Sequence, residues 1–158
     1  MSQTDPPLIL VVDDSPAILQ MIGKALYDSG YNVGAAGGAG DALAFIEVRQ
    51  PDLILLDVMM PEYDGIQLCR DLKQRDDTVD VPVIFMTALV DIDDKIRGFD
   101  AGAVDYITKP VRNEEMLARV RTHIELCRQK RELKSLVETK DRLFSIISHD
   151  LRAPLSGL

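Results

Sequence analysis

Four short apolar runs in this chain each end on a polar side chain. The runs begin at Leu8, Leu53, Val83 and Val104, and the polar residues that follow them are Asp13 and Asp14, Asp57, Thr87 and Lys109. Runs this short and this apolar are typical of strands that are buried on both faces of a parallel sheet. Ligands bind at the carboxyl ends of the strands in open α/β sheets, so we expect these polar side chains to meet at one edge.

Segments with helical spacing separate the runs. The first is well delimited, with Ser15 as the N-cap, Pro16 in the first helical position and Gly30 as a left-handed stop. Asp64 and Asn113 are expected to cap two later helices. The expected strands cover residues 8–12, 31–36, 53–56, 81–86 and 103–107, with helices beginning at about residues 16, 40, 64, 92 and 113.

Five strand–helix units in strict alternation predict an α/β fold, a doubly wound parallel sheet with helices on both faces. Right-handed crossovers restrict the topology and favour a flavodoxin-like (βα)5 arrangement with strand order 2-1-3-4-5. The first and third strands are neighbours in that order. We therefore expect Asp13, Asp14 and Asp57 to lie close together.

The last helix is expected to continue well past the sheet. No Gly or Pro occurs between Val111 and Pro154, which allows a helix of roughly 40 residues. Its apolar residues fall on three heptad positions: Leu126, Leu133 and Ile147; Leu136 and Leu143; and Val137, Phe144 and Leu151. Such a stripe is typical of a helix bundle or coiled coil. We therefore expect an α/β domain in residues 1–123 and a coiled-coil extension in residues 124–158 that forms a homodimer.

Charge differs between the two parts. Residues 1–122 carry 21 acidic and 11 basic side chains, whereas residues 123–158 carry 5 acidic and 7 basic ones. An acidic main body argues against nucleic acid as a direct partner, because phosphate contacts need Lys and Arg patches. No apolar run reaches the length of a membrane span and no signal peptide is visible, so we expect a cytoplasmic protein. Cys69 and Cys127 are isolated and form neither a disulfide framework nor a metal site.

Three carboxylates at one site repel one another unless a cation compensates their charge. Mg²⁺ is the natural cofactor, since it prefers one or two carboxylates, a carbonyl and retained waters. A carboxylate beside such an ion can attack a phosphoryl group and form an aspartyl phosphate. Lys109 would supply a fixed ammonium and Thr87 a hydroxyl for the transferred oxygens. The glycine-rich segment 34–40 lacks the spacing of a phosphate-binding loop and is interpreted as a strand-to-helix turn.

Four motifs in this order resemble those of a response-regulator receiver domain of a two-component system. They are Val-Val-Asp13-Asp14, Leu-Leu-Asp57-Val-Met-Met-Pro61 with Gly65, Met-Thr87-Ala88, and Tyr106-Ile-Thr-Lys109-Pro110. The resemblance covers residues 8 to about 123. It implies that Asp57 accepts a phosphoryl group from the phosphohistidine of a histidine kinase or phosphotransfer protein.

The same resemblance implies further roles. Asp14, Asp57 and the backbone carbonyl of Met59 would hold Mg²⁺, with Asp13 helping through water. Thr87 and Tyr106 would move together on phosphorylation, shifting a pre-existing equilibrium. The Lys109–Pro110 bond is expected to be cis.

A motif near the end, Phe144-Ser-Ile-Ile-Ser148-His149-Asp150-Leu-Arg152-Ala-Pro154-Leu, resembles the H-box of a histidine kinase dimerisation and phosphoacceptor domain. The resemblance implies that His149 is autophosphorylated and that Asp150 aids proton removal. The motifs of an ATP-binding domain are missing, so the chain alone is not expected to phosphorylate itself from ATP. We expect a piece of a hybrid protein in which the receiver regulates a protein-histidine kinase.

Two other functions compete with this interpretation. A haloacid-dehalogenase-like phosphatase also uses an aspartyl nucleophile with Mg²⁺ on an α/β sheet, but it needs an Asp-x-Asp pair on the first strand, where this chain has Asp13-Asp14. The second alternative is a stand-alone receiver that acts only as a dimerisation scaffold. The intact group of Asp57, Lys109 and Thr87 argues against that alternative.

Overall fold

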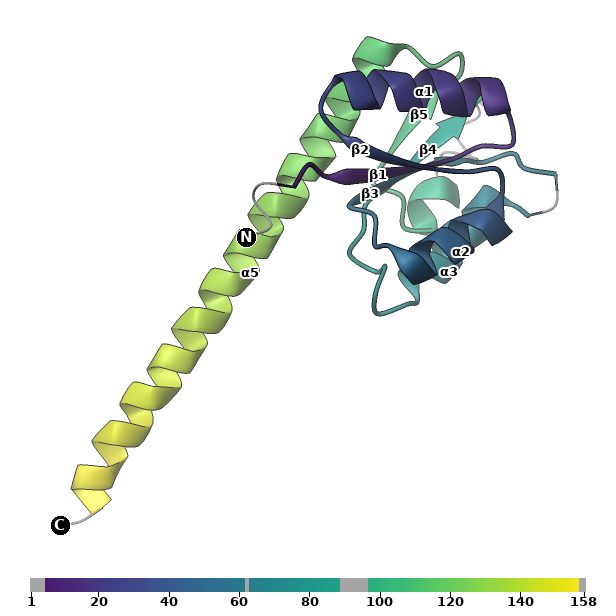
Figure 1. Cartoon of the computed structure of the whole chain (residues 1–158). Helices are drawn as coiled ribbons and strands as arrows, with labels where there is room; N and C mark the ends of the chain where they lie inside the picture. Colours follow the sequence, from purple (N-terminus) through teal and green to yellow (C-terminus); the bar gives the residue numbers. More distant parts are fainter. Residues whose placement is uncertain (1–4, 62, 89–96, 157–158) are drawn as a thin grey trace. The chain divides into compact units, whose positions relative to one another are not determined.

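The five strands of the computed structural model form one parallel sheet, in the predicted order β2-β1-β3-β4-β5 (Figure 1). The structure describes residues 5–61, 63–88 and 97–156, with side chains to Leu151. The strands are β1 (Leu8–Val12), β2 (Asn32–Ala36), β3 (Leu53–Asp57), β4 (Val83–Thr87) and β5 (Asp105–Thr108). The predicted flavodoxin-like fold class is therefore confirmed.

The helices are α1 (Pro16–Asp28), α2 (Ala39–Val48), α3 (Gly65–Lys73) and the long α5 (Asn113–Ser156), and residues 97–100 are also helical. The side chain of Ser15 accepts a hydrogen bond from the Ile18 N–H, and Gly30 has a φ of +96°, so both predicted ends of α1 are confirmed. Asp64 caps α3 as predicted. Asn113 was expected as a cap but lies inside α5, which also runs through Pro154 to Ser156. Residues 92–96 of the expected fourth helix lie outside the described residues.

Consecutive residues of each strand point to opposite faces of the sheet, which produces two separate cores. Ile9 and Val11 of β1 pack in a cluster with side chains of α1 and α5, including Met116 and Val120. Leu10 packs in a second cluster with side chains of α2 and α3. Figure 1 shows α1 on one side of the sheet and α2 and α3 on the other. Burial of such side chains stabilises the fold by about 1.5–3 kcal/mol each.

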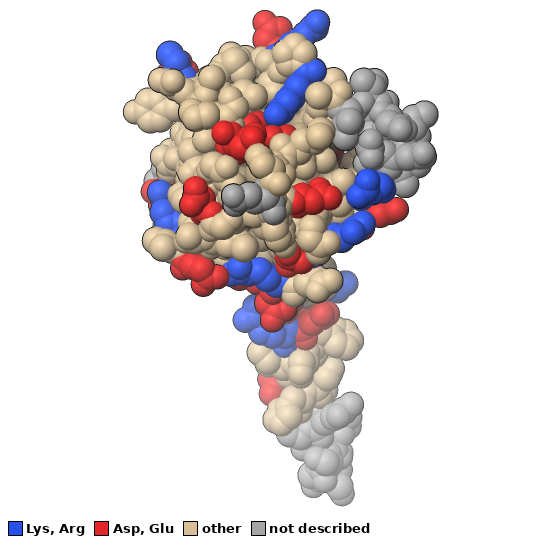
Figure 2. Space-filling view, turned by 90° about the vertical axis from the view of Figure 1, so that its right-hand side faces the viewer, with Lys and Arg blue, Asp and Glu red and all other residues tan. Residues whose placement is uncertain are grey.

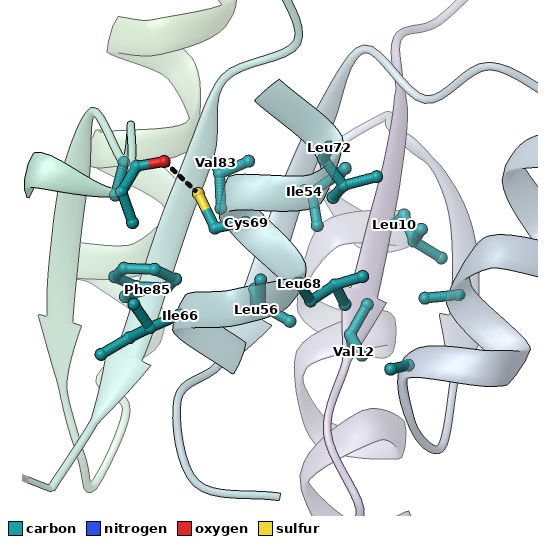
Figure 3. Close-up of a cluster of buried hydrophobic side chains, with 14 of the residues drawn as sticks. Leu10, Val12, Ile54, Leu56, Ile66, Leu68, Cys69, Leu72, Val83 and Phe85 are labelled. Carbon is teal, nitrogen blue, oxygen red and sulfur yellow. Dashed lines mark hydrogen bonds between the residues drawn. The ribbon is translucent and has the colours of Figure 1, made fainter. Parts of the chain in front are cut away.

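Cys69 belongs to the second core, which Figure 3 shows in close-up. Its side chain is fully buried on α3, and its Sγ donates to the backbone carbonyl of Ala101 at 3.5 Å. Burial raises the pKa of the Cys69 thiol to about 11. The thiol is therefore a packing group that links α3 to the segment before β5, since only a thiolate is a good nucleophile or metal ligand.

Gly65 allows the start of α3 to lie directly against the end of β3. A Cβ at this position would overlap the Asp57 carbonyl oxygen and lie 2.9 Å from the Val58 Cα. Both neighbours are backbone atoms, which cannot rotate away. Gly65 therefore sets how closely α3 approaches the strand that carries Asp57.

Contacts divide the chain into two units, Met1–Ile124 and Glu125–Leu158. The second unit is the later part of α5, and its large apolar side chains are exposed, among them Leu133, Leu136 and Phe144. Among the described residues, we find no helix with the length and apolar character needed to cross a membrane.

Replacing Gly65 with Ala is expected to destabilise the protein by about 1–3 kcal/mol, the usual cost of forcing extra atoms into a packed site. Gly40 supplies a matched control, because it is exposed in α2 and an added Cβ would meet nothing within 4 Å. Gly40→Ala is expected to stabilise the protein by about 0.5–1 kcal/mol, as Ala does in a helix. Urea unfolding of both variants checks this, and equal effects at the two positions would contradict it.

Candidate functional site

Three carboxylates meet at the carboxyl ends of β1 and β3. Asp13 and Asp14 directly follow β1, and Asp57 is the last residue of the neighbouring β3. One carboxylate oxygen from each of the three lies within 4.8 Å of the others. Asp13 and Asp57 are buried, whereas Asp14 is exposed. Figure 2 looks onto this end of the sheet and shows acidic side chains gathered near the middle of the face. The strand order thus brings the three predicted aspartates together.

Backbone hydrogen bonds hold two of these carboxylates in place. The Ser15 N–H donates to Asp13 Oδ1 at 2.9 Å, and the Met59 N–H donates to Asp57 Oδ1 at 3.1 Å. Each donor lies two residues after its acceptor, so the chain turns back on itself directly after each strand. These turns keep one oxygen of each carboxylate occupied and leave the other oxygen for a further partner.

Lys109 places an ammonium between the two buried carboxylates. Its Nζ lies 3.0 Å from Asp13 Oδ2 and 3.2 Å from Asp57 Oδ1. The residue follows β5, and its backbone N–H donates to the Thr87 carbonyl at 2.8 Å, which ties the ends of β4 and β5 together. The Lys109–Pro110 peptide bond is cis. Lys109 is therefore held by both its backbone and its side chain.

The three carboxylates outnumber the single ammonium, and burial together with these charges shifts the pKa values of Asp57 and Lys109. Burial raises the pKa of Asp57, and the nearby charge of Asp13 raises it further, against the opposing effects of Lys109 and the Met59 N–H. Burial alone would lower the pKa of Lys109, but its bonds to Asp13 and Asp57 raise it. Lys109 is therefore charged at neutral pH, and the site keeps a surplus of negative charge. That surplus and the oxygen-only donor set fit a hard divalent cation.

The fold disfavours the ionised form of Asp57. A carboxyl group whose pKa is raised by folding binds its proton more tightly in the native state than in the unfolded state. Between the ordinary pKa and the raised one, the stability of the fold therefore falls as the pH rises. A cation that binds the ionised carboxylate offsets this loss.

Thr87 and Tyr106 lie on the same face of the sheet. Thr87 is the buried last residue of β4. Tyr106 of β5 pairs with Phe85, which lies two residues before Thr87 on β4. Side chains two residues apart on a strand share a face. The ring of Tyr106 is half-buried and contacts Phe99 edge-on, with 6.0 Å between the ring centroids.

His149 and Asp150 lie in the second unit, on α5. Both side chains are largely exposed, at 86% and 75%, and His149 Nδ1 is 3.8 Å from Asp150 Oδ1. At that distance the pair is a loose contact and not a hydrogen bond. The structure therefore leaves the imidazole accessible.

The structure also contains a charged group that the sequence reasoning did not identify. Asp105 on β5 contacts Arg119 and His123 on α5. Arg119 and His123 are four residues apart and so share a helix face. This spacing was the only sequence signal, because the partner carboxylate comes from a different element.

Comparisons with known proteins agree on the class of this domain. Residues 9–121 match the family model described as "Response regulator receiver domain". The chain is 51% identical over 117 residues to the DNA-binding dual master transcriptional regulator RpaA of Synechocystis, covering 73% of this chain and 48% of RpaA. The chain thus spans about half the length of this relative.

Two solved structures have the same fold. A putative response regulator from Chloroflexus aurantiacus has a TM-score of 0.73 at 36% identity, covering 77% of this chain and 99% of the other. The signal receiver domain of a signal transduction histidine kinase from Syntrophus aciditrophicus has a TM-score of 0.70 at 37% identity, covering 75% and 90%. Together with the sheet order and the aspartate cluster, these matches show that the chain belongs to the response regulator receiver domain family.

Proposed function

We propose that Asp57 is the phosphoacceptor of a two-component phosphorelay and that its phosphorylation regulates an attached histidine kinase. The single observation that carries the first part is the placement of Asp57. Its buried carboxylate lies 3.2 Å from the Lys109 ammonium and within 4.8 Å of two further carboxylates. A carboxylate in this position can act as a nucleophile while a fixed positive charge faces the incoming oxygens.

In the proposed step, an Asp57 carboxylate oxygen attacks the phosphorus of a phosphohistidine. A new O–P bond forms and the P–N bond breaks, with its electron pair returning to the imidazole nitrogen of the donor. The Lys109 ammonium faces the transferred oxygens, on which negative charge is spread in the transition state. The Thr87 hydroxyl is the proposed hydrogen-bond donor to one of them.

Asp14, Asp57 and the Met59 carbonyl are the proposed ligands of Mg²⁺, with Asp13 acting through water. When bound, the ion supplies positive charge that neutralises the phosphoryl oxygens. The exposed position of Asp14 leaves room for retained waters, which Mg²⁺ prefers. After phosphoryl transfer, Thr87 and Tyr106 are proposed to shift together, because they share a face of the sheet on the neighbouring strands β4 and β5.

The match to the receiver family favours Asp57 over the Asp13-Asp14 pair as the nucleophile, and it counts against the phosphatase alternative. The cluster also counts against a scaffold that is never phosphorylated. Persistent turnover of a general phosphatase substrate would favour the phosphatase.

Incubation of the chain with acetyl phosphate and Mg²⁺ is expected to add the mass of one phosphoryl group, detected by intact-protein mass spectrometry. Asp57→Asn should abolish the addition, and Lys109→Gln should slow it strongly. The initial rate should fall at low pH, because only the ionised Asp57 carboxylate attacks and because protons compete with Mg²⁺ for the carboxylates. Asp28→Asn, at an exposed ion pair on α1, is the matched control and should leave uptake unchanged. Uptake that persists in Asp57→Asn would show that the wrong nucleophile has been assigned.

The kinase part of the proposal is supported by the H-box motif around His149 and by the exposure of its imidazole. The receiver from Syntrophus aciditrophicus, which belongs to a histidine kinase, shows that this type of domain occurs with such a kinase. RpaA, in contrast, is described as DNA-binding, which makes a DNA-binding output the competing candidate. We favour the kinase because a motif that resembles the H-box lies after the receiver on the same helix, α5.

Labelling of His149 tests the kinase proposal. A histidine-kinase ATP-binding domain supplied in trans with ATP is expected to phosphorylate the chain on His149. His149→Gln should lose this label and keep the uptake at Asp57 from acetyl phosphate. Absence of any ATP-dependent label on the wild-type chain would favour the DNA-binding candidate.

We further propose that the second unit joins two copies of the chain through its apolar stripe. Leu133, Phe144 and Leu151 are more than half exposed, although they occupy recurring heptad positions. A helix with this much apolar surface is stabilised when a second helix covers it. A parallel arrangement would place the two His149 side chains near the same end.

Sedimentation is expected to show a dimer whose population rises with protein concentration. Phe144→Glu, which puts a charge into the stripe, should shift the protein to the monomer. Ile146→Glu is the matched control, because Ile146 is 59% exposed but does not belong to the three heptad positions. A monomer in the wild-type chain at high concentration, or equal loss in both variants, would contradict this proposal.

A further inference from the structure

The carboxylate of Asp105 makes four polar contacts. Arg119 Nη1 lies 2.8 Å from both of its oxygens, and His123 Nε2 lies 3.0 Å from Oδ2. The Tyr106 backbone N–H donates to Oδ1 at 2.8 Å. Burial alone would raise the pKa of Asp105, but the hydrogen bonds from His123, Tyr106 and Arg119 lower it. We call Asp105, Arg119 and His123 the β5–α5 clasp.

The clasp lies at the end of the part of α5 that packs against the sheet. Met116 and Val120 are fully buried, and Ile124 is partly buried against the same core. Beyond Ile124, no described side chain of α5 is buried. His123 thus binds Asp105 of the sheet one position before the boundary of the first unit.

The clasp also adjoins Tyr106. Asp105 precedes Tyr106 on β5, and its side chain binds the Tyr106 N–H, so the two residues share one short piece of backbone. A shift of that backbone would move the Asp105 carboxylate as well. The carboxylate is short and held on both oxygens, so it is a stiffer link than a long exposed ion pair.

We propose that the β5–α5 clasp passes a change at Tyr106 to helix α5, with Asp105 as the positioning residue. This inference rests on the proposed phosphoacceptor role of Asp57. The clasp has a basal function, which is to hold α5 to β5 in the unmodified protein. Its second function is to couple the position of β5 to the helix after phosphorylation.

Hydrogen exchange on the full chain tests both functions, with mass spectrometry of peptides that cover residues 113–130. In the wild-type chain, acetyl phosphate and Mg²⁺ are expected to change the exchange of this region. Asp105→Asn should speed its basal exchange severalfold, since local opening becomes easier. The same variant should take up phosphate at Asp57 as the wild type does, but the response of residues 113–130 should be lost.

Two further variants separate the clasp from a general loss of stability. Arg119→Gln removes the same contact from the helix side at a partly exposed position and should act like Asp105→Asn. Asp105→Glu keeps the charge and should restore part of the response. Asp28→Asn, which breaks an exposed pair on α1, should change neither the basal exchange nor the response.

The possible outcomes are distinct. Phosphate uptake with an intact exchange response in Asp105→Asn would overturn the clasp as the link and leave the phosphoacceptor in place. Unchanged basal exchange in that variant would overturn its anchoring function. Absence of uptake in the wild type would overturn the proposed phosphoacceptor and the coupling with it, whereas faster basal exchange in Asp105→Asn would still support the anchoring.

Discussion

The repulsion between buried carboxylates at the ends of β1 and β3 is the constraint on which the site depends. Asp13 and Asp57 are both removed from water, and one ammonium lies between them. One positive charge cannot neutralise three negative ones, so the ionised cluster has a free-energy cost for the fold. A site with surplus negative charge of this kind binds cations more readily than one that is already neutral, and a bound cation would in turn offset the charge of a phosphoryl group. The excess of carboxylates that lowers the stability of the fold is thus also the feature that suits the site to bind a cation.

The rest of the fold keeps this cost tolerable. The carboxylates follow strands whose own residues are fully buried, so the chain cannot relax away from them without giving up apolar contacts. Backbone N–H groups from Ser15 and Met59 fix their orientation, and the absence of a Cβ at Gly65 lets α3 close in behind Asp57. Lys109 is held through the Thr87 carbonyl. The proposed site residues lie at or just after the ends of strands, and the strands fix their positions.

The features that sequence reasoning predicted depend on local patterns. The apolar runs and the polar residues that follow them identified the sheet and the members of the aspartate cluster. The starts of the last two strands were placed two residues early, because Val81 and Ala103 are apolar and buried but precede the ladder. The β5–α5 clasp was missed for a different reason. Asp105 meets residues 14 and 18 positions later only because Met116 and Val120 dock the helix on the sheet.

The division of side chains between two cores has a consequence for how the receiver comes apart. Ile9 and Leu10 are adjacent in the chain, yet they stabilise different helical layers. If one helical layer detached, it would expose one face of the sheet. The other face, which carries the second layer, is built from the same strands. Partial detachment therefore gains little chain entropy for the apolar surface that it exposes. The first unit is therefore expected to unfold as one cooperative block, with its edge strands and helix ends opening most easily.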